Sequence, residues 1–535
     1  MQPPRFPSCV FPQRSVCSGR MRRALEQMAM VAGATVGSRL LGLLRDVLLF
    51  AMLGAGAVNS AFLLAFTLPN LFRRLLGEGA LTSAMVPVLA GEAESAGRAS
   101  VFLLFNQVIT RLLLVLGGIA GGGMLLLALL RVLVEWSPRY ALALELGILL
   151  LPYLIFVCLA AAVSSALHVL DRFGVASLSQ IWLNLSMIAS LGIGATPWVG
   201  SAEERVLWLC GGVLVGGVAQ VLAPAIAMAK EGWRPALVWG ERARLQPLMT
   251  LLIPGLLGAA VVQVNIMVSR LIAFWFSPDA VSILYLANRL VELPLGVFVI
   301  AVTTVCFPAI ARYAARGQLV PFVEEYQHAQ RLILAISLPA GIGLILLGGP
   351  ILELLFAYGA FSSGDVAKTV VPLAIYAAGL PLYAMATLAT RGLHARRDMR
   401  SPVRIAVINL FLNIVLSLAL LFPLGIAGLA IANVVASGVQ WWMLSRALRR
   451  HTESRLPHLP WRALGVITTA SLGMILLLLM GRWGLSPWMS PGKAEAALLV
   501  GVLIPMAILL YAALLWFLRF EDRQALRDLL FRRTP

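Results

Sequence analysis

The sequence predicts an all-α protein that crosses a membrane about fourteen times. Of its 535 residues, 60% are hydrophobic and only 12% are charged, and the mean hydropathy is +0.90. This apolar share is far above that of soluble domains. The apolar residues form long runs, and a membrane-spanning helix needs roughly 20 of them. The charged residues gather in the short gaps between the runs, so little of the chain is left for a soluble domain.

Breaks that contain charged residues, Pro or Gly divide the apolar sequence into runs that are each long enough for one span. Residues 1–20 are rich in Pro, Ser and Arg and lack the apolar segment of a signal peptide. We expect them to be a disordered or mis-annotated extension, with Met21 as the true start. The apolar runs cover approximately residues 25–53, 59–90, 100–134, 141–170, 175–197, 205–229, 246–276, 281–311, 322–348, 366–394, 402–422, 425–448, 460–482 and 495–519.

Lys and Arg are distributed unevenly over the loops between the runs. If the N-terminus is cytoplasmic, basic clusters such as Arg396, Arg397 and Arg400 fall on the cytoplasmic side, and the other side is nearly free of them. This asymmetry orients membrane proteins. The basic tail, residues 521–535, also falls on the cytoplasmic side because the number of spans is even. The net charge of +18 therefore reflects membrane topology, and no nucleic-acid partner is predicted.

The two halves of the sequence share residue types in the same order, at an offset of roughly 220–230 positions, as in a duplicated transporter. Each copy holds six spans, and because six is even, both copies enter the membrane in the same direction. We expect a parallel repeat of two lobes, residues 21–245 and 246–455, with the substrate path between them. The last two spans, within residues 456–520, lie outside the repeat. The matched segments are Ser38–Leu40 with Ser269–Leu271, Leu167–His168 with Leu393–His394, Asn184 with Asn409, and Gly217–Gln220 with Gly438–Gln440.

Several charged side chains lie inside predicted spans, where a cation costs about 2.5 kcal/mol or more unless it faces a polar cavity or a partner. Arg45 with Asp46, and Arg74 with Glu78, could be internal ion pairs that tie helices together. Taken together, the cationic excess favours a cavity for an anion, because a structural network tends towards neutrality. The guanidinium fork suits a phosphate or diphosphate. The candidate residues are Arg39, Arg45, Asp46, Asn70, Arg73, Arg74, Glu78, Asn288, Arg289 and Glu292.

Other polar residues give no indication of catalysis. The amides Gln263, Asn265, Asn413 and Asn433 could line a cation site, but isolated amides in membrane helices more often join helices to one another. The five cysteines show neither a CxxC pair nor metal-ligand spacing. No nucleotide-binding loop, HExxH or paired-carboxylate motif occurs. We therefore predict a transporter with no cofactor and no metal, and not an enzyme.

Three blocks of sequence, in order, resemble those of one transporter family. They are Gly37–Gly42 with Arg45 and Asp46, Leu68–Arg74 with Glu78–Ala80, and Ala287–Leu290 with Glu292 and Pro294–Val297. From about Met21 to its end, the chain resembles the MurJ (MviN) family of lipid II flippases, within the superfamily of multidrug, oligosaccharidyl-lipid and polysaccharide exporters. The resemblance implies fourteen helices in two lobes, a cationic central cavity that opens alternately to each face, and a hydrophobic groove beside the last two helices for a polyprenyl tail.

The resemblance also implies a function in cell-wall synthesis. The substrate would be lipid II, the undecaprenyl-diphosphate-linked disaccharide pentapeptide, carried from the cytoplasmic to the periplasmic leaflet of the bacterial inner membrane for peptidoglycan synthesis. Membrane lipids and cell-wall synthesis proteins are implied as further partners. The family's cavity arginines would hold the diphosphate and sugar headgroup beside their acidic partners while the lobes rock. These positions correspond to Arg39, Arg45, Arg73 and Arg289, with Arg74 beside them, and to Asp46, Glu78 and Glu292.

The sequence departs from the family pattern at several positions. Asn59 and Ser60 stand where many relatives have an acid after the first loop, and Asn288 stands where they have Asp. Ser269 and Ser417 occupy places that resemble the aspartates of a sodium-binding pattern in some members. Because the hard anionic ligands that sodium favours are missing, we expect membrane potential or protons to bias the cycle instead.

Other classes of function fit the sequence less well. A drug or cation antiporter of the same superfamily should have an acidic or aromatic cavity, whereas a flippase for another lipid-linked oligosaccharide would share a cationic one. A membrane-embedded glycosyltransferase or phosphatase needs carboxylates or histidines clustered near one face, but Asp46, Glu78 and Glu292 are scattered. A purely structural scaffold does not account for intramembrane arginines in a repeated sequence.

Overall fold

The computed structural model describes residues 14–240, 242–453, 461–485 and 492–524. Within these ranges every regular element is a helix, which confirms the all-α class. Of the expected N-terminal extension, residues 1–13 lie outside the described ranges, and the first helix already begins at Arg14. Most of the expected basic tail, residues 525–535, is likewise outside them.

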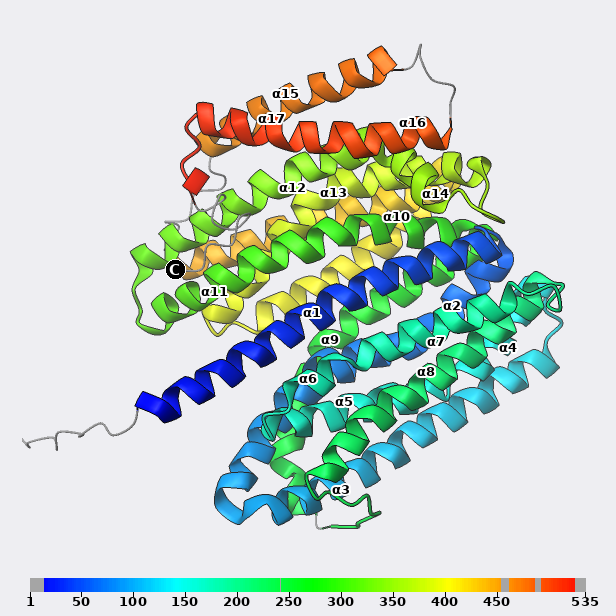
Figure 1. The fold of residues 1–535 in the computed structure, drawn as a ribbon, viewed down its shortest axis with the longest axis vertical. Helices are drawn as coiled ribbons and strands as arrows, with labels where there is room; N and C mark the ends of the chain where they lie inside the picture. Colours follow the sequence, from blue (N-terminus) through cyan, green and yellow to red (C-terminus); the bar gives the residue numbers. More distant parts are fainter. Residues whose placement is uncertain (1–13, 241, 454–460, 486–491, 525–535) are drawn as a thin grey trace, which may run out of the picture.

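The described chain forms long α-helices, three of which continue into short π-helical segments, labelled η (Figure 1). A π-helical turn interrupts the regular α-helical ladder, and such turns are frequent at functional sites. In chain order the elements are α1 (Arg14–Leu53), α2 (Ala57–Phe72), η1 (Arg73–Ala80), α3 (Leu81–Leu133), α4 (Pro138–Leu150), α5 (Tyr153–Val169), α6 (Phe173–Ser177), α7 (Ser179–Gly194), α8 (Ala202–Lys230), α9 (Arg242–Phe276), α10 (Ala280–Pro294), η2 (Leu295–Val299), α11 (Ile300–Ala315), α12 (Leu319–Phe356), α13 (Ser363–Ala395), α14 (Arg400–His451), α15 (Trp461–Leu485), α16 (Lys493–Leu498), η3 (Leu499–Leu503) and α17 (Ile504–Phe517).

In the described ranges these helices make fourteen passes, the number that the apolar runs predict. Eleven continuous helical stretches are long and apolar enough to span a membrane. Two of them, residues 57–133 and 400–451, bend where Gly97 (φ 77°) and Gly425 (φ 58°) adopt a left-handed conformation, so each stretch makes two passes. Glycine adopts this conformation without a steric penalty. The charged helix α1 adds the remaining pass.

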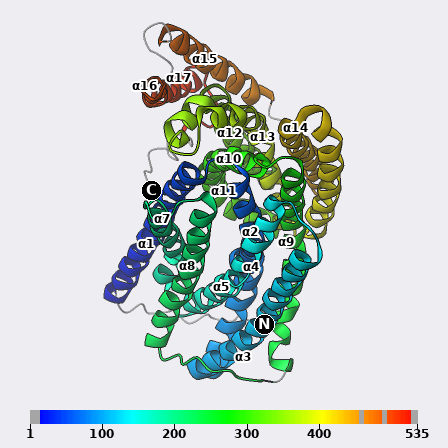
Figure 2. The same ribbon diagram turned by 90° about the vertical axis from the view of Figure 1, so that its right-hand side faces the viewer.

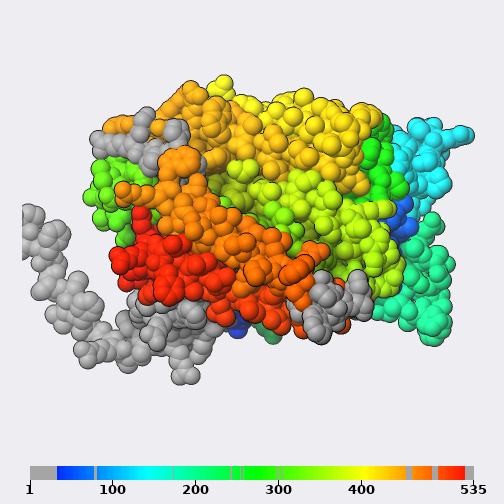
Figure 3. Space-filling model, turned by 90° about the horizontal axis from the view of Figure 1, so that it is seen from above, coloured from blue at the N-terminus to red at the C-terminus, as the bar shows by residue number. Residues whose placement is uncertain are grey.

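The passes form two groups of helices, α1–α8 and α9–α14, which we name the N-terminal lobe and the C-terminal lobe (Figures 1 and 2). In the first group, α7 packs on α8 and α1, and α5 packs on α3 and α8. In the second, α13 packs against α12, α14 and α10. The lobes meet where α2, η1 and α3 contact α9 and where α2 contacts α10. The last helices, α15–α17, pack against α12 on the outside of the C-terminal lobe, as the space-filling view shows in orange and red (Figure 3).

The second span of each lobe contains the same irregularity. α2 continues into η1 shortly after Pro69, and α10 continues into η2 directly after Pro294. A proline inside a helix removes one backbone hydrogen bond and disturbs the turn before it. The starts of these two helices meet in space, because the hydroxyl groups of Ser60 and Ser282 lie 3.1 Å apart. The two proline-containing spans therefore contribute to the contact between the lobes.

Three loops lie together at one end of the molecule, at the right-hand edge of Figure 1, and we name this end the three-loop face. The loops are residues 54–56, 277–279 and 357–362. Here the Ala360 N–H donates to the Ala51 carbonyl (2.7 Å), which joins the lobes backbone to backbone. This close approach requires glycine at Gly54 and Gly359, where φ is 64° and 58°. A Cβ on Gly359 would overlap the Ala51 carbonyl.

Aromatic rings extend this contact towards the middle of the protein. Phe50 packs edge-on against Phe356 (5.9 Å between ring centroids) and Phe361 (5.5 Å), and all three rings are buried. Lys368 binds Asp279 across the rim of the same face (2.8 Å). Burial alone would raise the pKa of Asp279, but its hydrogen bond with the Lys368 ammonium helps to hold that pKa below the usual value. The three-loop face is therefore closed.

The segment between α8 and α9, which joins the lobes, is bound along α3. The Asn106 amide holds it twice: its Nδ2 donates to the Arg234 carbonyl (3.0 Å), and its Oδ1 accepts from Trp233 Nε1 (2.8 Å). The buried Trp233 ring packs edge-on against Phe105 (5.6 Å). This connection is therefore part of the packing of the N-terminal lobe.

We expect Trp233→Ala to lower the free energy of unfolding by about 3 kcal/mol, as for other truncations of buried aromatic rings. The change removes the ring and leaves the Asn106 carbonyl oxygen without its donor. Thermal unfolding of the purified protein in detergent measures the effect. Trp239→Ala is the matched control, because Trp239 lies in the same segment and is 73% exposed. If the two changes lower the free energy of unfolding equally, Trp233 does not hold the connection between α8 and α9 against α3.

Candidate functional site

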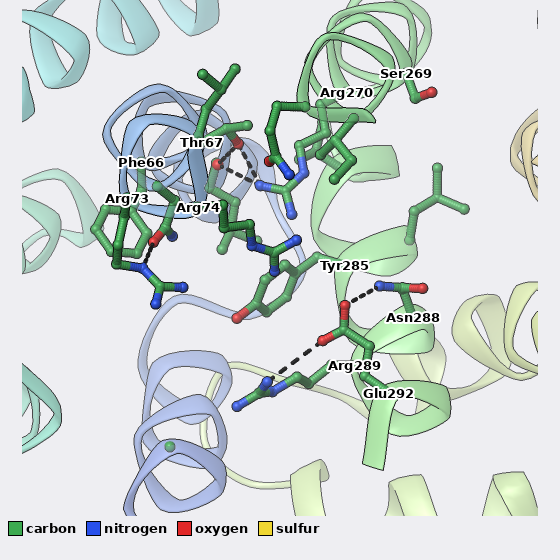
Figure 4. Close-up of a pocket in the computed structure, with 18 of the residues that line it drawn as sticks. Phe66, Thr67, Arg73, Arg74, Ser269, Arg270, Tyr285, Asn288, Arg289 and Glu292 are labelled. Atoms are coloured by element: carbon green, nitrogen blue, oxygen red, sulfur yellow. Dashed lines mark hydrogen bonds and ion pairs between the residues drawn. The ribbon is translucent and has the colours of Figure 1, made fainter. Parts of the chain in front are cut away.

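A cavity of about 630 Å³ lies between the lobes, beyond the closed contacts of the three-loop face. Its walls come from α1, α2, η1 and α7 in the N-terminal lobe and from α9, α10, α13 and α14 in the C-terminal lobe. Figure 4 shows the side chains that project into it. In transporters built from repeats, the interface between the repeats near the middle of the membrane is the usual substrate site.

Most of the candidate residues chosen from the sequence face this cavity. Among the described side chains, Asp46 is the exception, because it is fully buried directly behind Arg45. The side chain of Glu78 lies outside the described residues. The candidates that line the cavity are Arg39, Arg45, Asn70, Arg73, Arg74, Asn288, Arg289 and Glu292.

Asp46 joins two arginines, one from each lobe. Its Oδ1 accepts from Arg45 on the same helix (2.6 Å), and its Oδ2 accepts from Arg289 on α10 (2.8 Å). Arg45 also donates to Asn184 Oδ1 (3.1 Å), and the Asn184 amide donates to the Ser38 carbonyl (3.1 Å). The internal ion pair of Arg45 and Asp46 considered from the sequence is therefore present, and it also borders the cavity. The bond to Arg289 makes it a contact between the lobes.

Two further arginines are held by nearby oxygen atoms. Arg39 Nη2 donates to the Gly296 carbonyl (2.9 Å) in η2, so this contact also crosses between the lobes. It lies at the end of the cavity that is farther along α1 from the three-loop face. Arg73 Nε donates to Asn70 Oδ1 (3.0 Å) within its own lobe. The far end of the cavity thus has a polar contact between the lobes, whereas the three-loop face has backbone and aromatic contacts.

Arg270 lines the cavity but was not among the residues predicted for it. Its Nη1 donates to the Leu63 carbonyl (3.2 Å) and to the Thr67 hydroxyl, both on α2, and its guanidinium lies 5.5 Å from the centroid of the Tyr285 ring. The internal repeat contains the signal that could have found it, because Arg270 is the counterpart of Arg39. Each of the two donates to a backbone carbonyl in the second span of the other lobe.

Arg74 has no partner among the described residues, and Figure 4 shows its guanidinium extending into the cavity. Six arginines line the cavity, while the carboxylates described at it are only Glu292 on its wall and Asp46 behind it. Positive charge is therefore in excess among the described side chains. Such an excess, screened little in a site walled by helices, attracts an anion that carries several charges. A guanidinium with free donors can bind one phosphate through two hydrogen bonds.

Neutral polar groups from α9 and α14 form another part of the site. Asn413 Nδ2 donates to Asn265 Oδ1 (3.0 Å) and to Ser269 Oγ (3.3 Å), and Ser417 Oγ donates to Asn413 Oδ1 (3.2 Å). These amides join two helices, which is the role predicted for them. In the part of the chain that the structure describes, no group of three or more His, Cys, Asp or Glu side chains could hold a metal ion. The expectation that sodium does not drive the cycle stays a prediction.

Fourteen helical passes in two repeated lobes around a charged cavity define a polytopic membrane transporter. A family model described as "Lipid II flippase MurJ" matches residues 49–511. The chain belongs to this family, as its sequence motifs predict.

Relatives and solved structures agree with this assignment. The "Probable lipid II flippase MurJ" of Vibrio cholerae is 30% identical over 524 residues, which cover 94% of this chain and 98% of that protein. The protein of the same name from Rhizobium meliloti is 32% identical over 514 residues, or 91% and 93% of the two chains. A structure titled "Lipid II flippase MurJ, inward closed conformation" has a TM-score of 0.76 at 23% identity, over 92% of this chain and 99% of that one. An inward-facing MATE transporter of the MOP superfamily has a TM-score of 0.67 at 14% identity, over 78% and 95%. The two structural likenesses show that this chain shares their all-α transporter fold.

Proposed function

We propose that this protein carries lipid II, the undecaprenyl-diphosphate-linked precursor of peptidoglycan, from the cytoplasmic to the periplasmic leaflet of the bacterial inner membrane. Membership of the lipid II flippase family supports the substrate. The observation that carries the proposal is the excess of arginine in the cavity, with Arg74 free to bind. A diphosphate is the part of lipid II that matches this charge and the guanidinium geometry.

In this proposal the diphosphate binds Arg74 first, and Arg39, Arg73 and Arg289 then turn towards it. Arg39 and Arg289 also make the contacts between the lobes, to the Gly296 carbonyl and to Asp46. An anion that draws these two arginines away weakens the closed arrangement at the cavity. A ligand shifts a conformational equilibrium only through such a difference in affinity for the two states. Binding of the diphosphate is thereby coupled to the rocking of the lobes.

We also propose how the protein lies in the membrane. Residues 21–245 and 246–455 are the two moving lobes, and both termini are cytoplasmic, so that the three-loop face is periplasmic. Residues 456–520 form the groove for the polyprenyl tail, and the packing of α15–α17 on α12 supports a peripheral position for it. Membrane lipids and cell-wall synthesis proteins would contact the outer surface. A flippase for another lipid-linked oligosaccharide would use the same arginines, whereas the cationic cavity does not favour a cation antiporter.

The test is complementation of a bacterium depleted of its own lipid II flippase. We expect the wild-type protein to restore growth and Arg74→Ala to fail at equal membrane levels. Loss of a charge-assisted hydrogen bond of about 1.5–3 kcal/mol should weaken binding of the diphosphate by roughly ten- to a hundredfold. Arg316→Ala is the matched control, because this arginine lies in the loop after α11, away from the cavity.

Two results would count against the proposal. If correctly inserted wild-type protein does not restore growth, the substrate is a different lipid-linked oligosaccharide. If Arg74→Ala restores growth as well as Arg316→Ala does, the free guanidinium does not bind the substrate.

A further inference from the structure

The cavity wall is not uniformly cationic. Arginines from α1 and η1 make up one part of it. A second part, formed by α9, α13 and α14, carries uncharged polar side chains beside Arg270, and we name these uncharged side chains the amide wall. Its members are Gln263, Asn265, Tyr376 and Asn433.

Hydrogen bonds inside the protein fix which group each amide presents to the cavity. Asn433 Oδ1 accepts from the Tyr383 hydroxyl (2.9 Å), and Asn265 Oδ1 accepts from Asn413 (3.0 Å). The Nδ2 groups of Asn433 and Asn265 have no acceptor among the described residues. Two amide N–H donor groups are therefore held in position at the cavity without an acceptor among the described residues.

The other two members, Gln263 and Tyr376, make no side-chain hydrogen bond within the described chain. Gln263 is half-buried, and neither end of its amide is bonded. Tyr376 is buried, and its hydroxyl is unbonded. These groups face the cavity, where water can reach them when no ligand is bound. Four uncharged polar groups with hydrogen-bonding capacity left over in the described chain, all on one wall, suit a ligand rich in oxygen atoms that bear no charge.

We infer that the amide wall binds the uncharged carbohydrate and peptide amide groups of the lipid-linked headgroup, while the arginines bind its diphosphate, so that the amide wall determines which headgroup is accepted. This inference rests on the proposed function. Arginines alone hold every lipid diphosphate in the same way, including an undecaprenyl diphosphate that carries no headgroup. A carrier without sugar leaves the amide wall unpaired, and sites that hydrogen-bond a ligand reject analogues that lack its polar groups.

The experiment measures the affinity of the purified full-length protein in lipid nanodiscs for two lipids, lipid II and undecaprenyl diphosphate. The wild type should bind lipid II more tightly. Gln263→Leu and Asn433→Leu should each weaken binding of lipid II by about tenfold, the equivalent of one hydrogen bond, and leave undecaprenyl diphosphate unchanged. Arg74→Ala should weaken both lipids alike. Gln330→Leu is the matched control, because this buried amide lies on α12 and does not line the cavity.

Gln263→Leu breaks no bond within the described protein, so its effect does not depend on a change in folding. The inference would be overturned if the wild type bound the two lipids with equal affinity. It would also be overturned if the leucine variants lost affinity for both lipids equally, or for neither. These results leave the complementation test, and with it the proposed function, standing. Failure of the wild type to bind either lipid would overturn the proposed function itself.

Discussion

Asp46→Ala should abolish transport and lower the free energy of unfolding by about 3–5 kcal/mol, the usual cost of breaking a buried ion pair. Asp46 is fully buried and binds Arg45 and Arg289 at 2.6 Å and 2.8 Å. Its removal leaves the buried guanidinium of Arg45 without a counter-charge, leaves Arg289 with only the more distant Glu292 (3.6 Å), and removes a contact between the lobes. Complementation and thermal unfolding in detergent measure the two effects.

A double-mutant cycle separates this mechanism from a general loss of folding. Arg289→Ala removes one of the two cations that Asp46 binds, so the double variant with Asp46→Ala should unfold at a higher temperature than the sum of the single effects predicts. Glu203→Ala is the control for loss of an acid, because Glu203 is exposed in the first turn of α8. Strictly additive effects of Asp46→Ala and Arg289→Ala would show that the bond between them contributes nothing.

Gly359→Val should destabilise the closed state of the three-loop face. Gly359 has φ 58°, a conformation that costs a residue with a side chain roughly 1–2 kcal/mol. The added side chain would also overlap the Ala51 carbonyl, which accepts the backbone bond that joins the lobes. Since 1.4 kcal/mol is a factor of ten in population, we expect the open population at this face to rise by about tenfold or more.

Labelling of a cysteine introduced at Ser282 measures this population. Ser282 is fully buried beneath the closed face, so a membrane-impermeant maleimide should react slowly in the wild-type background and faster with Gly359→Val. The native cysteines are replaced first. Gly56→Ala is the matched control, because Gly56 lies in the first of the three loops with φ −72° and open space around its Cβ position. Unchanged labelling in Gly359→Val would mean that this face closes by other contacts.

The fold could be predicted from the sequence to a large extent, because the cost of burying polar groups in lipid fixes where spans begin and end. The predicted breaks at residues 90–100 and 422–425 coincide with the bends at Gly97 and Gly425. The first helix was predicted to begin near residue 25, but it begins at Arg14. Hydropathy does not detect a helix that continues beyond the membrane with polar residues.

The site could be predicted only in part. Charges inside apolar runs pointed to Arg74 and its neighbours, since a cation there needs a cavity or a partner. Sequence spacing within one helix contains no information on partners more than two hundred residues away, such as Arg289 for Asp46 or Thr67 for Arg270. A proline inside a span indicates an irregular helix, but the π-helical carbonyl of Gly296 that accepts from Arg39 depends on the detailed backbone path.

The aromatic contacts at the three-loop face imply that the opening of this face depends on temperature. At the three-loop face, opening would bring the rings of Phe50, Phe356 and Phe361 into contact with water. The stabilisation that burial of such apolar surface provides weakens on cooling. At the other end, the bond from Arg39 to the Gly296 carbonyl is accompanied by buried apolar packing of Leu89 and Leu104 on α3 beside Leu248 on α9. Cold should therefore loosen both ends, and the opening of the three-loop face should carry a heat-capacity change from its three rings.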